Sequence, residues 1–168
     1  MTPEELAHHL EPRFPDAIVA RGEVTIISDP RDILDSLRSL RDDDAVAFDA
    51  LSDIAATDWP GRKPRFWLAY QLRSSEHEHR VRLKAGLAET NPKIASATEL
   101  FPTANWLERE IYDLMGIEFT GHPDLSRILL PDDWEGHPHR KTESLGGVDT
   151  RYHGAFIPPV DERLGGAR

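Results

Sequence analysis

Four side chains in the last third of the sequence are of the types that bind metal ions. His122 and Asp124 stand two residues apart, and His137 and His139 form a second pair with the same spacing. Imidazole nitrogens and carboxylate oxygens both suit Zn²⁺ and other divalent ions. The spacing matches no zinc signature, and a proline follows two of the histidines, so a turn with locally hydrogen-bonded histidines is the simpler interpretation. A free-standing metal-dependent hydrolase built on these four residues remains an alternative.

Other catalytic patterns are weak or missing from the sequence. It contains no G-x-S-x-G, P-loop, H-E-x-x-H or strand-linked G-x-G-x-x-G motif. Asp132 and Asp133 could form a pair of carboxylates for acid–base chemistry, but adjacent acids after a proline are commonly just a turn. The absence of cysteine excludes disulfides, thiol catalysis and cysteine-ligated zinc or iron–sulfur clusters. We therefore predict no catalytic, cofactor-binding or metal-binding residue in this chain.

A helix predicted over residues 104–115 carries an unusual pattern of charges. Its apolar positions form one buried face, and the opposite face is predicted to expose Trp106, Arg109, Glu110 and Asp113. Arg109 and Asp113 can pair, yet a basic residue before an acidic one opposes the helix dipole and the preferred order of such pairs. A solvated face is one interpretation. The other is that these charges meet complementary charges in the C-terminal segment or on a partner.

The remaining pattern predicts the elements that must position these side chains. Helices are expected after Thr2 and Asp29, and strands over residues 24–27, 45–51, 65–73 and 78–84. The last two strands should form an antiparallel hairpin, with His77 and His79 as solvated turn residues. This order predicts an α+β fold with a mixed or antiparallel sheet and helices packed on it.

The C-terminal part of the sequence has a different character. Residues 117–168 hold 7 of the 11 glycines and 5 of the 13 prolines, with few periodic apolar positions. Such a segment cannot build a core of its own. We therefore predict an α+β domain over residues 1–116 and an extended, Gly/Pro-rich segment over residues 117–168, either disordered or laid along another protein.

Charge and hydropathy narrow the class of protein. The 30 acidic residues outnumber the 20 basic ones, for a net charge of −10, which disfavours a nucleic-acid binder. No run approaches 18 apolar residues, and the first residues lack the pattern of a signal peptide. A cytoplasmic setting is expected.

Several motifs together resemble a known family. The run E-R-E-I-Y-D-L-M-G-I at 108–117, followed by H-P-D-L at 122–125, resembles the C subunit of the proton-pumping NADH–quinone oxidoreductase, respiratory complex I. W-x-G-H-P and R-K within 131–141 and the stretch 51–59 extend the resemblance. The end of the chain, 146–163, is similar to the actinobacterial type. Ser126, where the family commonly has a basic residue, is a departure.

This resemblance implies a structural subunit of the peripheral arm that supports NADH-to-quinone electron transfer. Its C-terminal segment would lie along the large hydrogenase-like D subunit at the quinone site, with the B and I iron–sulfur subunits as further partners. Flavin, iron–sulfur clusters and quinone would reside in those partners. The chain would sit on the cytoplasmic side of the plasma membrane, attached only through the complex. The equivalent subunit of an F420H2 dehydrogenase or a membrane-bound hydrogenase would look much the same and is the main alternative.

On the basis of this resemblance, ten polar residues are expected at subunit interfaces. They are Glu108, Arg109, Glu110, Asp113, His122, Asp124, Arg127, His137, Arg140 and Lys141.

Overall fold

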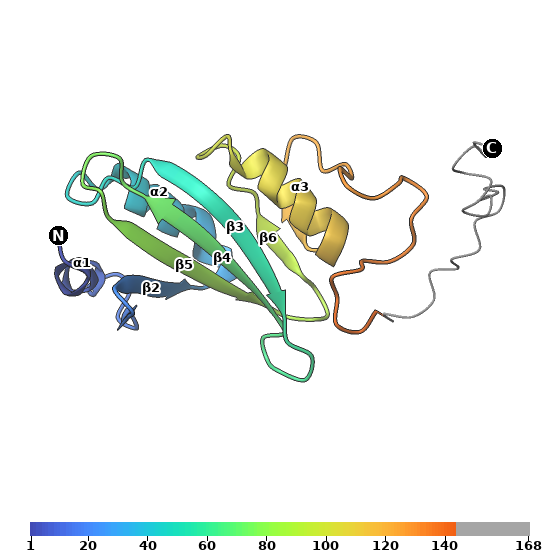
Figure 1. Ribbon diagram of the computed structural model, residues 1–168, viewed down its shortest axis with the longest axis horizontal. Helices are drawn as coiled ribbons and strands as arrows, with labels where there is room; N and C mark the ends of the chain where they lie inside the picture. The colour runs from blue at the N-terminus through green and yellow to red at the C-terminus, as the bar shows by residue number, and fades with distance from the viewer. Residues whose placement is uncertain (144–168) are drawn as a thin grey trace, which may run out of the picture.

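A five-stranded mixed sheet forms the centre of the computed structural model, which describes residues 1–143 (Figure 1). Its strands lie in the order β1-β2-β5-β4-β3. β2 and β5 are parallel, and the other neighbours are antiparallel. The strands are β1 (Ile18–Ala20), β2 (Glu23–Ser28), β3 (Ala50–Asp58), β4 (Phe66–Arg73) and β5 (Arg80–Leu87).

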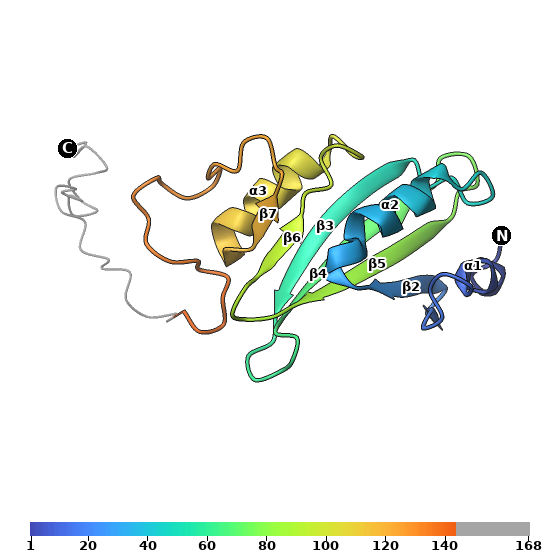
Figure 2. The same ribbon diagram turned by 180° about the vertical axis from the view of Figure 1, so that it is seen from behind.

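Helices and a second small sheet complete the fold. They are α1 (Pro3–Leu10), the turn η1 (Pro30–Asp32), α2 (Ile33–Asp42), α3 (Ala104–Met115) and the parallel pair β6 (Lys93–Ala95) and β7 (Glu118–Thr120). Figure 2 shows α2 lying across one face of the sheet, with α3, β6 and β7 beside it. The predicted α+β class is therefore confirmed.

Alternation along β4 shows why this sheet has one buried face. Phe66, Leu68, Tyr70 and Leu72 are buried, whereas the residues between them are partly exposed. Since successive side chains of a strand point to opposite faces, the first set packs under the helices. Each Å² of apolar surface that these side chains remove from water stabilises the fold by about 25 cal/mol.

Local signals set the helix ends as predicted. Thr2 and Glu5 form a capping box in which each side chain bonds the other's backbone N–H. Asp29 accepts the N–H of Arg31 at the start of η1, which runs directly into α2. Gly116 ends α3 with φ 67°.

Two predictions about the hairpin region are wrong. The strand expected over 45–51 begins only at Ala50, because Val46 and Phe48 enter the core from a loop. His79 is buried and not solvated, and its Nε2 donates to the Val46 carbonyl at 2.7 Å. Burial also lowers the pKa of His79, so this histidine acts as a neutral donor in the core.

The packed part of the chain continues beyond the boundary predicted at residue 116. Ile117 and Phe119 are fully buried, and β7 pairs with β6 through Thr120. Residues 121–143, here called the arm, then run back over α3 in an extended path (Figure 1). The rest of the predicted C-terminal segment, 144–168, lies outside the described residues. Across residues 1–143, no helix combines the length and apolarity that crossing a bilayer requires.

Candidate docking site

A buried carboxylate on α3 fixes the middle of the arm. The Asp113 side chain is inaccessible to solvent, and its Oδ2 accepts the N–H groups of Ile128, Leu129 and Leu130 at 2.8–3.1 Å. Arg127 Nη1 donates to Oδ1 at 2.8 Å. Burial tends to raise the pKa of Asp113, but the three amides and Arg127 outweigh it and hold the pKa below its ordinary range. One ionised side chain therefore gathers four donors from the arm.

The start of the arm is fixed by side chains along α3 and by its backbone. Arg109 donates to the Ser126 carbonyl at 3.0 Å and to the Ser126 hydroxyl at 2.7 Å. His122 Nε2 donates to the Asn105 carbonyl at 3.2 Å. The Arg109 guanidinium also stacks over the Trp106 ring. Arg109 and Asp113, whose spacing would allow them to pair, bind the arm instead, and the prediction that Asp113 lies on the exposed face is wrong because it is buried.

The end of the arm covers the last carbonyls of α3, which have no hydrogen-bond donor inside the helix. His137 Nδ1 donates to the Asp113 carbonyl at 2.9 Å, and the His139 N–H donates to the Leu114 carbonyl at 3.0 Å. Arg140 donates to the carbonyls of Met115 and Gly116 at 2.7 and 3.2 Å. A positive side chain near a helix C-terminus also interacts favourably with the negative end of the helix dipole.

Gly116 allows the arm to pack against the C-terminal end of α3 for two reasons, so a substitution there should destabilise the chain. Its φ of 67° strains any residue with a Cβ, and a Cβ there would meet the His137 ring and the Arg140 guanidinium. We expect Gly116→Ala to lower the free energy of unfolding by more than the roughly 1–2 kcal/mol that a left-handed residue costs. Urea denaturation measures the loss. Gly121→Ala is the control, because it has φ 82° but open space, and an equal loss in both variants would contradict the contact argument.

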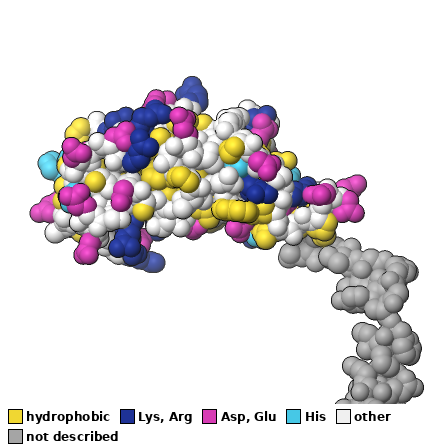
Figure 3. Space-filling model, turned by 90° about the horizontal axis from the view of Figure 1, so that it is seen from above, with side chains coloured by type: hydrophobic (Ala, Val, Ile, Leu, Met, Phe, Trp, Pro, Cys, Tyr) yellow, Lys and Arg dark blue, Asp and Glu magenta, His cyan; other side chains and the backbone are white. Residues whose placement is uncertain are grey.

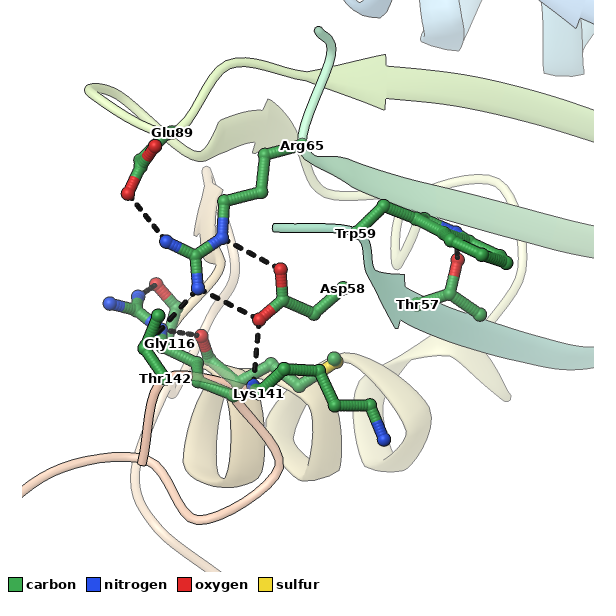
Figure 4. A network of polar contacts seen from close by, with 10 residues as sticks. Thr57, Asp58, Trp59, Arg65, Glu89, Gly116, Lys141 and Thr142 are labelled. Carbon is green, nitrogen blue, oxygen red and sulfur yellow. Dashed lines mark hydrogen bonds and ion pairs between the residues drawn. The ribbon is translucent and has the colours of Figure 1, made fainter. Parts of the chain in front are cut away.

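A second buried carboxylate receives the end of the arm (Figure 4). Asp58, at the end of β3, forms a bidentate pair with Arg65 at 2.7 and 2.8 Å, and both side chains are nearly inaccessible. Asp58 also accepts the Lys141 N–H at 2.9 Å, and Arg65 donates to the Thr142 hydroxyl at 3.2 Å and pairs with Glu89. The Arg65 hydrogen bonds lower the pKa of Asp58.

A third acidic residue, Glu108, is buried inside the domain and does not reach the arm. It accepts the Ser96 hydroxyl at 2.6 Å and the Ala97 N–H at 2.7 Å. Burial raises the pKa of Glu108 from 4.5 to about 7, although these two donors oppose the rise. Tyr70 is fully buried with an unpartnered hydroxyl, and the nearby Glu108 carboxyl adds to the rise of its pKa that burial causes.

The raised pKa of Glu108 predicts a pH-dependent effect of Glu108→Gln. Between pH 4.5 and 7 the folded carboxyl binds more protons than the unfolded one, so its contribution to stability falls as the pH rises, by up to about 1.4 kcal/mol per unit. The variant should match the parent near pH 5 and exceed its free energy of unfolding near pH 8. Denaturation curves at both values test this, and a variant less stable at pH 8 would contradict it.

The ten predicted interface residues differ in burial and in the groups that they contact. Glu108 and Asp113 are fully buried with partners inside the chain, and Arg109, Arg127, His122, His137 and Arg140 hold the arm. The side chains of Glu110, Asp124 and Lys141 are exposed.

Residues 1–143 contain no group of three metal-ligating side chains placed to hold an ion. The four candidate ligands are separated by their local partners. The Asp124 N–H donates to His122 Nδ1. His137 instead donates to the Asp113 carbonyl at the end of α3.

Large apolar side chains remain exposed on the outer side of α3 and the arm. Trp106 is 64% exposed, Leu129 59% and Trp134 39%. Figure 3 shows hydrophobic patches of this kind among charged side chains of both signs. Such exposed aromatic and aliphatic groups are typical of contact surfaces.

Comparison with known proteins defines the class of the chain. Residues 26–148 match the sequence model of the respiratory-chain NADH dehydrogenase 30 Kd subunit, so the chain belongs to that family. Relatives named as the C subunit of NADH-quinone oxidoreductase include those of Salinispora tropica, 43% identical over 95% of this chain and 69% of theirs, and Roseiflexus castenholzii, 44% identical over 85% and 84%. The resemblance predicted from the sequence is confirmed.

Solved structures agree with this assignment. A trypsin-resistant fragment (1-134) of Nqo5 has a TM-score of 0.64 and 27% identity, and it covers 74% of this chain and all of its own. A chain of an archaeal membrane-bound sulfane sulfur reductase has a TM-score of 0.72, covering 84% of this chain and 85% of its own. At 24% identity the second match supports the fold alone.

Proposed function

We propose that the chain is a structural, cofactor-free subunit of a proton-translocating NADH–quinone oxidoreductase, on the cytoplasmic side of the membrane in the peripheral part of the complex. It docks the D subunit, which forms the quinone site, and adjoins the B and I iron–sulfur subunits. Electrons pass through those partners, and no catalysis comes from this chain. Family membership and the names of the relatives support the complex, and the arm over residues 121–143 supports the docking role.

The main support for this role is that the arm is anchored to the domain on one side and exposes two large apolar side chains among polar residues on the other. Asp58 and Asp113 take its backbone amides from the domain side, while Leu129 and Trp134 stay exposed on the other side. A surface already ordered before docking loses less conformational entropy on binding. The chain thus presents a prepared contact surface to a partner.

Purification from native membranes in mild detergent, through a tag on this chain, tests the proposal. Co-elution with flavoprotein and iron–sulfur subunits, together with NADH–quinone activity, is expected. A complex that elutes without NADH activity would favour the F420H2 dehydrogenase or hydrogenase alternative. A chain that elutes alone would contradict the docking role.

A further inference from the structure

The last strand of the sheet, β3, has an edge with unpaired backbone groups. The Trp59 N–H donates to the Arg65 carbonyl across the β3–β4 hairpin. Because hydrogen-bonded and non-hydrogen-bonded pairs alternate in antiparallel strands, Ile54 and Ala56 direct their N–H and C=O groups away from β4. Within residues 1–143, neither residue has a hydrogen bond on that side. The edge therefore offers two donors and two acceptors to another strand.

Neighbouring contacts define the two ends of this free edge. At the N-terminal end, Thr103 donates to the Leu51 carbonyl, and the register shifts between Leu51 and Asp53. At the C-terminal end, the Asp58 side chain binds the arm at Lys141. The open stretch runs over residues 53–57, about 16 Å at roughly 3.3 Å per residue. It has room for a strand of about five residues.

A groove of about 240 Å³ lies between this edge and α3. Ile54 and Ala56 form one wall, Ile111 and Leu114 the other, and His139 of the arm lies at one end. Lysine, proline and bulges commonly block long strand edges; β3 contains no lysine or proline, and its register shift lies between Leu51 and Asp53, at the end of the open stretch. The groove thus supplies apolar contacts beside the unpaired backbone.

The charged side chains in the groove have one sign. Asp53 and Glu110 line it, both are exposed, and neither forms an ion pair or a hydrogen bond through its side chain within the described part of the chain. Because successive side chains of β3 point to opposite faces, basic side chains on the two faces of an added strand would meet Glu110 on the α3 side and Asp53 on the other. The groove therefore favours a segment that is extended and positively charged.

We propose that this groove binds an extended basic segment of a neighbouring subunit, which adds to the sheet as a sixth strand beside β3. Backbone bonds to Ile54 and Ala56 provide the pairing, Ile111 and Leu114 contact its apolar residues, and Asp53 and Glu110 bind its lysines or arginines. This mode of recognition uses main-chain bonds for affinity and side-chain positions for specificity. The inference rests on the proposed function, because it needs the chain to sit in a complex.

Amide hydrogen exchange with residue resolution tests the inference in the free full-length chain and in the purified complex. The amides of Ile54 and Ala56 should exchange about a hundredfold more slowly in the complex than in the free chain. Those of Ala55 and Thr57, already bonded to β4, should be protected in both states. Fast exchange at Ile54 and Ala56 in a complex that contains the chain would overturn the inference. Absence of the chain from the complex would instead contradict the proposed function.

A charge reversal tests the sign of the occupant. Asp53→Lys with Glu110→Lys should remove the protection of Ile54 and Ala56 in the complex. Glu76→Lys with Glu99→Lys changes the net charge equally at exposed positions outside the groove and should leave the protection intact. Equal effects of the two double variants would overturn the charge argument. Protection that grows with concentration in the free chain would identify a second copy as the occupant and overturn the inference.

Discussion

Replacing Asp113 with alanine is expected to release the middle of the arm from α3 and to cost the folded chain about 3–5 kcal/mol. The loss is large because three partly buried amides and the Arg127 guanidinium lose their common acceptor at once. Two measurements test this effect: the free energy of unfolding in urea and the rate at which trypsin cleaves after Arg127. We expect that cleavage to accelerate at least about tenfold.

Two further variants separate the charge of Asp113 from its position. Asp113→Asn keeps one acceptor oxygen but loses the charge, so its effect should fall between the parent and the alanine variant. Glu110→Gln removes a carboxylate from the exposed side of the same helix and should change the free energy of unfolding of the free chain by less than about 0.5 kcal/mol. An unchanged cleavage rate in Asp113→Ala would show that other contacts hold the arm.

The second large effect is expected at the Asp58–Arg65 pair. Arg65→Met fills a similar volume but leaves Asp58 buried without its main counter-charge, which should cost about 3–5 kcal/mol. Asp58→Asn should cost less, because the amide still accepts one hydrogen bond. The double variant should lose less than the sum of the two single losses, since neither side then holds an unpaired buried charge. Strict additivity would contradict the coupling.

The same pair predicts a response to acid. Because Arg65 lowers the pKa of Asp58 below its unfolded value of 3.8, the folded carboxyl binds fewer protons than the unfolded one in that range. The stabilisation is present at neutral pH and disappears as the pH falls through the folded pKa. The difference in stability between the parent and Asp58→Asn should therefore shrink below about pH 4.

Patterns along the sequence predicted much of the sheet and its helices. The alternation of Phe66, Leu68, Tyr70 and Leu72 placed β4 with its buried face, and Thr2 and Asp29 marked helix starts. The pattern predicts a strand over 45–51 because Val46 and Phe48 are apolar and alternate with polar or small residues, whereas they lie in a loop. Their burial comes from packing between elements, which a local pattern does not record.

The sequence indicates that charged residues of α3 have partners outside the helix, but not the geometry of those contacts, and their role at a subunit interface stays a prediction. The order of charges in Arg109 and Asp113 indicated partners outside the helix, and both residues do bind the arm. Sequence patterns do not identify Asp58 and Arg65 as site residues. The pair connects the ends of β3 and β4 to Lys141 and Thr142, which lie more than 70 residues further along the chain. Helical periodicity places Asp113 on the exposed face, since it cannot show that residues 127–130 return to cover this side chain.

The most direct test of the docking role replaces the two large apolar side chains that the arm exposes and leaves its anchors in place. Leu129→Ser with Trp134→Ser should lower the melting temperature of the free chain by only roughly 2–5 °C, because Leu129 is 59% exposed and Trp134, at 39%, loses only part of its surface contacts. In a strain that lacks the natural chain, this double variant should be missing from the purified complex, and NADH–quinone activity in the membranes should fall in proportion. Ile18→Ser with Ile27→Ser is the control at similarly exposed positions away from the arm. Full incorporation and activity with the arm variant would contradict the account.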